Sequence, residues 1–368
     1  MTSIIPPSQF PNLFVNDTPL LDVRAPVEVS KGSFPTSTNI ALINDEQRRL
    51  IGIDYKQHGH ESAVALGHEL IAPNDRQQLL ERWLDYIANH QGAALYCYRG
   101  GQRSQFSQQW LADAGCSVPR IDGGYKALRN YLLGVLEQVA ANTQLLIAGG
   151  KTGSGKTHLI NALPFSVDLE GRANHRGSAF GLRTSPQPTQ IDFENALAVD
   201  FIKLPLPSIN RVILEDESHS IGSLHLPRSL YSKMSEAPLA IIEVPFAARV
   251  TTIFNDYILS NYTDFLSLDR QNAPDLFSQS LLDSLAKIQR RLGGELHQEI
   301  EKIMHQALRA QFSSNDSSGH RQWIDLLLQK YYDPMYEYQL AKKHHRIIFR
   351  GDSDEFLRWA TSLNNKST

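Results

Sequence analysis

A glycine-rich octapeptide, GKTGSGKT at residues 150–157, constrains the fold of this 368-residue chain more than any other segment. It satisfies the phosphate-binding pattern G-x-x-x-x-G-K-[ST], which needs a buried strand before it and a helix after it. Apolar residues predict that strand at 144–148, and the helix is expected at 155–163. Later apolar runs at 211–214 and 239–244 predict further strands. We therefore expect an α/β domain built on a parallel sheet.

The octapeptide is a Walker A motif, or P-loop, and its residue types suit a diphosphate. Backbone N–H groups would surround the phosphates, Lys156 would reach the terminal pair, and the Thr157 hydroxyl would ligate Mg²⁺. The predicted diphosphate-binding residues are Gly150, Thr152, Gly153, Ser154, Gly155, Lys156 and Thr157. The strand at 211–214 runs into Glu215 and Asp216, which form a Walker B-like end, and Asp216 joins Thr157 as a candidate Mg²⁺ ligand. A solvated acidic loop is the alternative for this strand end.

The chain before this motif alternates short apolar runs with amphipathic segments. Strands are predicted at 19–23, 93–96 and 120–121, and a helix at 125–141 closes this part. Beyond residue 262 the pattern becomes mainly helical, although a strand-like segment occurs at 345–351. We expect an α/β protein with a first domain at 1–141, a P-loop domain at 142–261, and a mainly helical region at 262–368 that packs on the P-loop domain.

A second anion site is predicted at YCYRGGQRS, residues 96–104, where Cys97 follows a strand and Arg103 opens a helix. Such a loop can turn its N–H groups toward one point, and Gly100 and Gly101 give it the backbone freedom to do so. An anion-binding field favours the thiolate, the nucleophilic form of cysteine, so Cys97 is the candidate catalytic residue. The predicted anion cradle consists of Arg99, Gly100, Gly101, Arg103 and Ser104. A small buried hydrophobic cysteine beside a polar turn is the alternative.

The charge balance excludes a strong overall positive field, because 36 Lys and Arg face 39 Asp and Glu. A nucleic-acid partner would need a local patch, for which the weak candidates are Lys342, Lys343, Arg346 and Arg350, downstream of several tyrosines. A solvated helix end explains the same residues. The glycine-rich segment at 168–181 is predicted to line a substrate site through Asp168, Glu170, His175 and Arg176.

The compartment follows from cysteine usage and hydropathy. Cys97 and Cys116 make no disulfide framework, and no apolar run reaches the roughly 20 residues that span a membrane. We expect a cytoplasmic protein without a membrane partner. His58, His60 and His68 lack a nearby cysteine to complete a zinc site, so no structural metal is expected there.

Residues 19–42, PLLDVRAPVEVSKGSFPTSTNIAL, and residues 121–129, IDGGYKALR, resemble the opening and closing motifs of a rhodanese domain. The resemblance implies that Asp22 and Arg24 brace the sheet. The cysteine loop is C-x5-R, one residue longer than the common C-x4-R rhodanese loop, and is similar to the loop of rhodanese-related phosphatases. A wider loop suits a tetrahedral phosphorus-type anion better than sulfur transfer from thiosulfate.

The order of motifs resembles the tRNA 2-selenouridine synthase family over essentially the whole chain: a rhodanese with C-x5-R, the P-loop, DLEG..NHRGSAFG, LEDES and YYDPMY...KK...FRG. The resemblance implies that wobble 2-thiouridine is S-geranylated with geranyl diphosphate and then converted to 2-selenouridine with selenophosphate. Cys97 would serve the selenium step and the P-loop would hold the diphosphate, with Mg²⁺ assisting and no requirement for ATP hydrolysis. The implied partners are the tRNA anticodon arm and the enzyme that produces selenophosphate.

Two other classes of function remain open on the residues alone. A P-loop kinase or NTPase with an appended rhodanese-like phosphatase or regulatory domain would turn over nucleotide in response to a small phosphoryl acceptor. A non-catalytic tRNA-binding adaptor would turn over neither nucleotide nor geranyl diphosphate.

Overall fold

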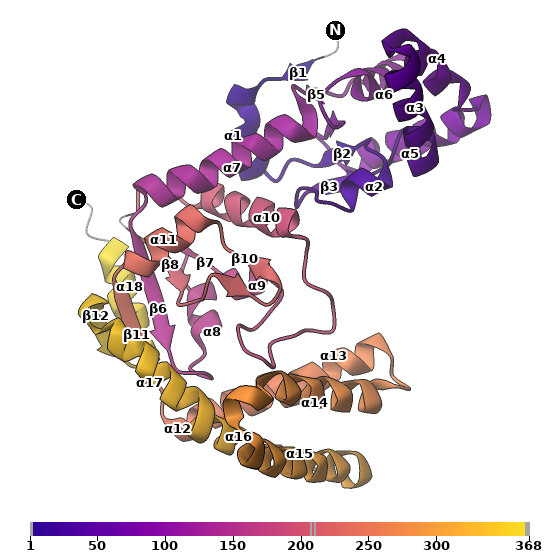
Figure 1. Ribbon diagram of the computed structural model, residues 1–368. Helices are drawn as coiled ribbons and strands as arrows, with labels where there is room; N and C mark the ends of the chain where they lie inside the picture. Colours follow the sequence, from indigo (N-terminus) through magenta and orange to yellow (C-terminus); the bar gives the residue numbers. More distant parts are fainter. Residues whose placement is uncertain (1–2, 207, 210, 365–368) are drawn as a thin grey trace. The chain divides into compact units, whose positions relative to one another are not determined.

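The computed structural model describes residues 3–206, 208–209 and 211–364, and the chain divides into two compact units (Figure 1). The first takes in the chain up to Gln138 together with Thr189–Lys203. The second takes in Val139–Pro188 and the chain from Leu204 onward. Each unit contains a five-stranded parallel sheet, which confirms the predicted α/β class. None of the helices in these described ranges has the length and apolar character needed to cross a bilayer.

The sheet of the first unit is short-stranded and has the order β1-β5-β4-β2-β3. Its strands are β1 Ile4–Ile5, β5 Arg120–Ile121, β4 Ala94–Tyr96, β2 Leu20–Asp22 and β3 Ser37–Asn39. β2 and β4 are buried throughout, as expected for central strands covered on both faces. At the end of β2, Arg24 donates to the Asp22 carboxylate at 2.6 Å, and the Tyr96 hydroxyl donates to the same carboxylate at 2.8 Å. The two charged residues therefore brace this sheet, as the rhodanese resemblance implies.

Helices from two distant parts of the chain belong to this unit. They are η1 Pro7–Gln9, α1 Phe10–Val15, α2 Pro26–Val29, α3 Asp45–His58, α4 His60–Glu69, α5 Pro73–Asn89, α6 Gln102–Asp113, α7 Gly124–Asn142 and α10 Gln190–Lys203. From chain order we expected α10 in the P-loop domain. In the structure Asp192 accepts from the Ser33 amide at 2.6 Å, and Asn195 accepts from Arg129 at 2.8 Å. These hydrogen bonds tie α10 to the first unit.

The sheet of the second unit has the order β12-β11-β6-β8-β7. Its strands are β12 Ile347–Gly351, β11 Leu239–Ile242, β6 Leu145–Gly150, β8 Val212–Glu215 and β7 Ser166–Val167, and a small hairpin joins β9 Ser220–Ile221 to β10 Leu224–His225. Every residue of β6, β8 and β11 is buried. The strand-like tail predicted at 345–351 thus completes the edge of the P-loop sheet.

The helices around this second sheet are short near the P-loop and long in the C-terminal half. They are α8 Lys156–Asn161, α9 Leu169–Arg172, α11 Arg228–Glu236, α12 Phe246–Ile253, η2 Phe254–Ser260, α13 Asn261–Leu268, α14 Ala273–Leu292, α15 Gly294–Ser314, α16 His320–Leu327, η3 Leu328–Tyr332, α17 Asp333–Lys342, η4 His344–Arg346 and α18 Ser353–Asn364. The predicted helix at 155–163 ends early at Asn161, because Pro164 disfavours the helical conformation just before it.

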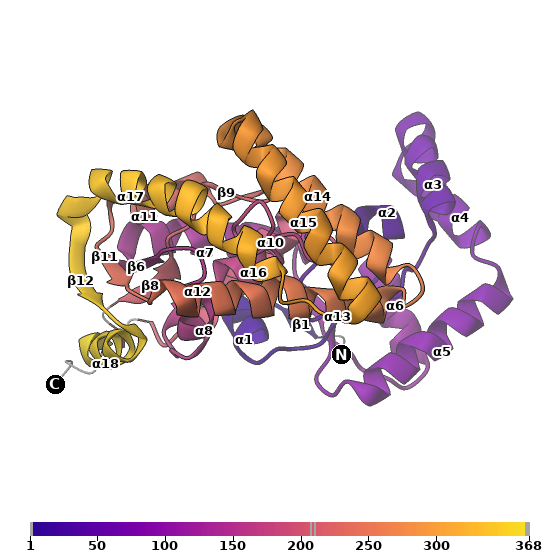
Figure 2. The same ribbon diagram turned by 90° about the horizontal axis from the view of Figure 1, so that it is seen from below.

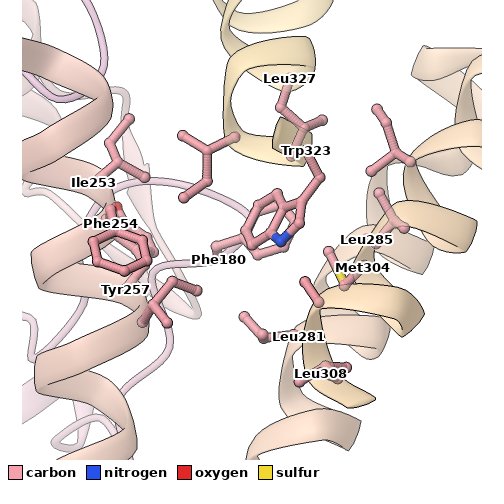
Figure 3. Packing of buried hydrophobic residues seen from close by; sticks show 14 of the residues in the cluster. Phe180, Ile253, Phe254, Tyr257, Leu281, Leu285, Met304, Leu308, Trp323 and Leu327 are labelled. Atoms are coloured by element: carbon pink, nitrogen blue, oxygen red, sulfur yellow. The ribbon is translucent and has the colours of Figure 1, made fainter. Parts of the chain in front are cut away.

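A large apolar cluster joins the C-terminal helices to the loop that follows α9. α14 and α15 lie side by side, and Figure 2 shows them as the two longest helices of this region. Figure 3 shows Trp323 of α16 against Phe180, with ring centroids 5.5 Å apart, and Leu281 and Met304 facing them from α14 and α15. This burial anchors the glycine-rich segment at 168–181, since Phe180 belongs to it. The last four residues of the predicted region 262–368 lie outside the described residues.

Two candidate anion-binding sites

Cys97 lies directly after β4 and lines a cavity of about 860 Å³. Cys97 is only 3% exposed and packs in a buried apolar cluster of the first unit, so the cavity is the side from which a small anion would approach the sulfur. The thiol contacts the Ser104 hydroxyl at 3.2 Å, and that hydroxyl donates to the Gly101 carbonyl at 2.9 Å. Ser104 therefore fixes the sulfur at the start of α6, as the predicted cradle requires.

The backbone of the cysteine loop accepts hydrogen bonds from the start of α7, while its own amides have none among the described residues. Tyr125 and Lys126, at the start of α7, donate their N–H groups to the carbonyls of Cys97 and Tyr98 at 2.9 and 3.0 Å. Within the described parts of the chain, the N–H groups of residues 98–101 have no hydrogen-bond partner. Gly100 is buried and Gly101 half-buried, and amides in such places need an acceptor, so this loop is suited to bind an anion.

Glycines let the loop approach the start of α7 this closely. Gly100 has a φ of +65°, and a Cβ there would lie 2.8 Å from the Gly123 nitrogen. Gly124 has a φ of +58°, and its Cβ would lie 2.3 Å from the Cys97 carbonyl oxygen. Only glycine fits either position without displacing the backbone. The second glycine pair, in IDGG, thus supports the cysteine loop from behind.

The two arginines of the predicted cradle differ in their surroundings. Arg99 is exposed and lines the cavity beside Cys97. Arg103 instead donates to both carboxylate oxygens of Glu28, at 2.5 and 3.0 Å. Although burial raises the pKa of Glu28, the hydrogen bonds and charge of Arg103 hold it below the ordinary value. Arg103 thus brings a carboxylate to the cavity wall, and Arg99 is the more available cation.

The P-loop has the backbone conformation that its glycines predict. Gly153 and Gly155 have φ values of +82° and +71°, and Lys156 begins α8. The Lys156 ammonium donates to the Gly150 carbonyl at 3.0 Å, so it lies over the loop. The predicted diphosphate-binding residues are therefore together in one turn between β6 and α8.

Two carboxylates meet the Thr157 hydroxyl, and they come from different segments. Thr157 is 3.0 Å from Glu215 at the end of β8 and 3.1 Å from Glu170 in α9. Asp216, the predicted Mg²⁺ ligand, turns away and pairs with Lys343 at 2.7 Å. The arrangement at Thr157 thus favours Glu215 and Glu170 over Asp216 as neighbours of a cation.

Glu217 completes an acidic cluster at this position that sequence reasoning missed. Burial first, and then the charge of Glu170, raises the pKa of Glu215 to about 8. Burial and the charges of Glu170 and Glu215 likewise raise the pKa of Glu217 well above its ordinary value, against the attraction of Lys156. The acidic run LEDES was the only signal for Glu217 in the sequence, and it did not distinguish which of its carboxylates turns inward.

Arg249 of α12 supports the P-loop from below. Its guanidinium donates to the Thr152 carbonyl at 3.1 Å and to both oxygens of Asp333 at 2.8 and 2.6 Å. The Arg249 side chain is 3% exposed, so this ion pair is shielded from solvent. The pair connects α12 and α17 to the loop, and explains why the DPMY segment belongs with the Walker motif.

The predicted substrate loop divides into residues that face the P-loop and residues that build the loop itself. Glu170 reaches Thr157, whereas Asp168 caps α9 by accepting from the Gly171 amide at 2.6 Å. His175 is buried and accepts from the Gly177 amide at 3.1 Å, and burial lowers the pKa of this imidazole. Arg176 lies 5.3 Å from the ring centroid of Tyr257.

The structure gives most of the predicted tRNA-binding cations partners within the protein. Lys343 pairs with Asp216, and Arg346 donates to the carbonyls of Ala237 and Met234 at 2.8 Å. Arg350 pairs with Glu243 at 3.1 Å, and Lys342 lies 4.0 Å from the Tyr338 ring centroid. These contacts give Lys343 and Arg346 structural roles, whereas Lys342 and Arg350 are exposed, so an RNA-binding patch there stays a prediction.

The histidines that invite a zinc interpretation have other contacts. His58 pairs with Asp54 at 2.7 Å, His60 contacts Gln102 at 2.9 Å, and His68 packs on Phe106. Across the described ranges, no group of three or more His, Cys, Asp or Glu side chains forms a ready metal site.

Comparisons with known proteins assign both units to families. Residues 143–367 match the model described as the tRNA 2-selenouridine synthase AAA domain, and residues 7–131 match the rhodanese-like domain. A tRNA 2-selenouridine synthase of Shewanella frigidimarina (strain NCIMB 400) is 46% identical over 360 residues, which cover 98% of each chain. Those of Shewanella oneidensis and Sulfurovum sp. (strain NBC37-1) are 45% and 42% identical, over 100% and 95% of this chain and 98% and 96% of their own. Because these relatives match along its whole length and the family model covers more than half of it, the chain belongs to the tRNA 2-selenouridine synthase family.

Proposed function

We propose that this chain converts wobble 2-thiouridine of tRNA to 2-selenouridine in two steps, S-geranylation with geranyl diphosphate followed by selenium transfer from selenophosphate. The observation that carries the proposal is the presence in one chain of two distinct loops whose geometry suits an anion. One has free backbone amides beside Cys97, and the other has Lys156 and Thr157 in a P-loop. Each step consumes one anionic co-substrate, so two sites match two steps.

The first step suits the P-loop unit. The thiouridine sulfur attacks the first carbon of geranyl diphosphate, the carbon–oxygen bond breaks, and pyrophosphate leaves, while the N3 proton of the base is released to water. Negative charge grows on the leaving group, so donors that are already oriented toward it lower the barrier. Lys156 and the N–H groups of the loop are such donors. This step needs no ATP hydrolysis.

The oxygens at Thr157 fit a magnesium ion. Mg²⁺ commonly takes one or two carboxylates together with substrate phosphates and water. Thr157, Glu215 and Glu170 offer one hydroxyl and two carboxylates within 3.1 Å of that hydroxyl. A bound Mg²⁺ would supply neutralising charge to the diphosphate and to Glu215, whose pKa is raised by burial and by the charge of Glu170.

The second step suits the cysteine loop. Selenium of selenophosphate attacks carbon 2 of the S-geranylated base, the carbon–sulfur bond breaks, and geranyl thiol leaves with a proton. Water then cleaves the selenium–phosphorus bond and phosphate departs. The free amides of residues 98–101 and the exposed Arg99 would hold the tetrahedral anion beside Cys97.

The partners follow from this scheme. The substrate is the anticodon arm of tRNA, and the enzyme that produces selenophosphate is the natural supplier of the donor. Both co-substrates and reduced thiols are at hand in the cytoplasm, where we place the reaction.

Mass spectrometry of nucleosides tests the proposal. An anticodon-arm RNA with 2-thiouridine is incubated with the full chain and both co-substrates, and then with each co-substrate omitted. We expect S-geranyl-2-thiouridine without selenophosphate, 2-selenouridine with both, and no product without geranyl diphosphate. Nucleotide turnover stimulated by a small phosphoryl acceptor, with no change to the RNA, would instead support the P-loop kinase function.

A further inference from the structure

The cavity above Cys97 is much larger than the anion proposed to bind there. Its volume is about 860 Å³. If each of the five non-hydrogen atoms of selenophosphate takes a water's share of volume, about 30 Å³, the anion needs at most about 150 Å³. Most of the cavity is therefore available to another part of the substrate.

The walls of this cavity combine charged and polar side chains, among them Arg48, Lys56 and His60, with apolar ones. Cys97, Arg99 and Gly101 line the end that carries the cysteine loop, whereas Ile51, Val64, Ile71 and Phe106 line other parts. An anion gains nothing from apolar walls, because burying charge against them is costly. The combination suits a ligand with an apolar chain attached close to an anionic group.

The helices that supply the apolar wall have little core of their own. α3 buries none of its fourteen residues, and α4 buries only Ala63. On α3, Ile53 and Tyr55 are 41% and 56% exposed, and both line the cavity. The two helices lie side by side (Figures 1 and 2). Ile53 and Tyr55 of α3 and Val64 of α4 line the cavity.

We infer that this cavity holds the geranyl chain of the S-geranylated nucleoside during the selenium step. The inference rests on the proposed function, in which the sulfur that carries the chain must lie within reach of the donor held at Cys97. The ten carbons of the chain need about 300 Å³ at a water's share each, which the cavity accommodates together with selenophosphate. The exposed cations Arg99 and Lys56 line the same cavity and complement the phosphates of the RNA.

The apolar cavity of the second unit does not offer this space. It is lined by Phe180, Tyr257, Trp323 and neighbouring side chains, and its volume is about 20 Å³. Of these two cavities, the one in the first unit is therefore the one with room for the geranyl chain after geranylation.

Binding of modified RNA tests the inference without any chemical step. Two anticodon-arm RNAs are compared, one with S-geranyl-2-thiouridine and one with S-methyl-2-thiouridine, and the Kd of each for the full chain is measured by fluorescence anisotropy. We expect the full chain to bind the geranylated RNA at least tenfold more tightly. Because both RNAs carry the same phosphates, the ratio of the two Kd values isolates the contribution of the geranyl group.

Two neighbouring positions of α4 provide the variants. Val64 lines the cavity, whereas Ala65 is exposed and does not. Val64→Trp fills the space and Val64→Gln makes it polar, so each should reduce the preference to less than threefold. Ala65→Trp and Ala65→Gln should leave it unchanged, and circular dichroism establishes that the variants fold.

The results separate this inference from the proposed function. No preference in the unaltered chain, or a full preference in folded Val64 variants, would overturn the inference. A preference that disappears in the Val64 variants supports binding of the geranyl group in the cavity, even if selenophosphate fails to convert the bound RNA. Such a failure would count against the proposed function alone.

Discussion

Replacing Gly124 by alanine should disable the cysteine loop without touching a side chain of the site. The new Cβ would lie 2.3 Å from the Cys97 carbonyl oxygen and 2.4 Å from the Gly100 nitrogen. Since real Cβ contacts are at least 3.0 Å, the loop or the start of α7 must move by about 0.7 Å. The φ of +58° adds a cost of about 1 kcal/mol for an alanine.

The expected effect is a loss of selenium transfer with geranylation retained. A displacement near 1 Å in a reacting geometry costs up to about 100-fold in rate, so we expect a decrease of roughly 10- to 100-fold. The assay measures 2-selenouridine formed from RNA that is already S-geranylated, by mass spectrometry over time. In parallel, geranylation of 2-thiouridine RNA is measured and should keep its original rate.

Gly134 provides the matched control, because it lies in the same helix with open space around the position of its Cβ. Gly134→Ala should leave both rates unchanged and should stabilise α7 by about 1 kcal/mol, since alanine is the better helix former. Selenium transfer at the original rate by Gly124→Ala, or an equal loss of both reactions, would refute the reasoning.

Three further predictions concern the second unit. Because burial raises the pKa of Glu215 from 4.5 to about 8, protonated Glu215 contributes to the free energy of unfolding fully below about pH 4.5, and this contribution is lost as the pH rises through about 8. The Tm, measured by calorimetry, should therefore fall over this pH range, and Glu215→Gln should make the fall less steep. Equal slopes of Tm against pH in both proteins would count against this prediction. Mg²⁺ should raise the Tm of the unaltered chain more at about pH 8.5 than at about pH 6, because it competes with the proton on Glu215, and equal shifts would argue against the proposed site. Arg249→Met should lower the free energy of unfolding by about 3 kcal/mol. This is the low end for a broken buried ion pair, because Lys151, 3.6 Å from Asp333, still partly compensates the carboxylate. An unchanged denaturation midpoint would contradict this prediction.

Motifs whose chemistry depends on local backbone conformation could be predicted from the sequence. The P-loop and the cysteine loop each require glycines at fixed spacing between a strand and a helix, and both adopt that arrangement. The parallel sheets followed from apolar runs with helices between them, because buried strands carry a strong hydrophobic signal.

Contacts between distant segments could not be predicted in this way. Nothing in the local pattern indicates that Glu170 meets Thr157, that Lys343 pairs with Asp216, or that α10 belongs to the first unit. Each depends on how separate segments pack together, and polar side chains leave no periodic signal for that.

The helices α3 and α4 could not be predicted either, for a reason that lies in their own sequence. No helix is predicted between Tyr55 and Leu70, because a pair of helices that buries almost nothing lacks a continuous apolar stripe. Tyr55, Ala63 and Val64 of this segment line the cavity above Cys97, so they occur at positions where a core-facing pattern does not require them.

The most direct test of the claim that two anion sites act on one nucleoside in succession is nucleoside mass spectrometry on two variants, Cys97→Ser and Lys156→Ala. Each is given 2-thiouridine RNA with both co-substrates, and then RNA that was S-geranylated in advance. We expect Cys97→Ser to accumulate S-geranyl-2-thiouridine, and Lys156→Ala to leave 2-thiouridine unreacted while still converting the geranylated RNA to 2-selenouridine. Full selenium incorporation by Cys97→Ser together with full geranylation by Lys156→Ala would contradict the account.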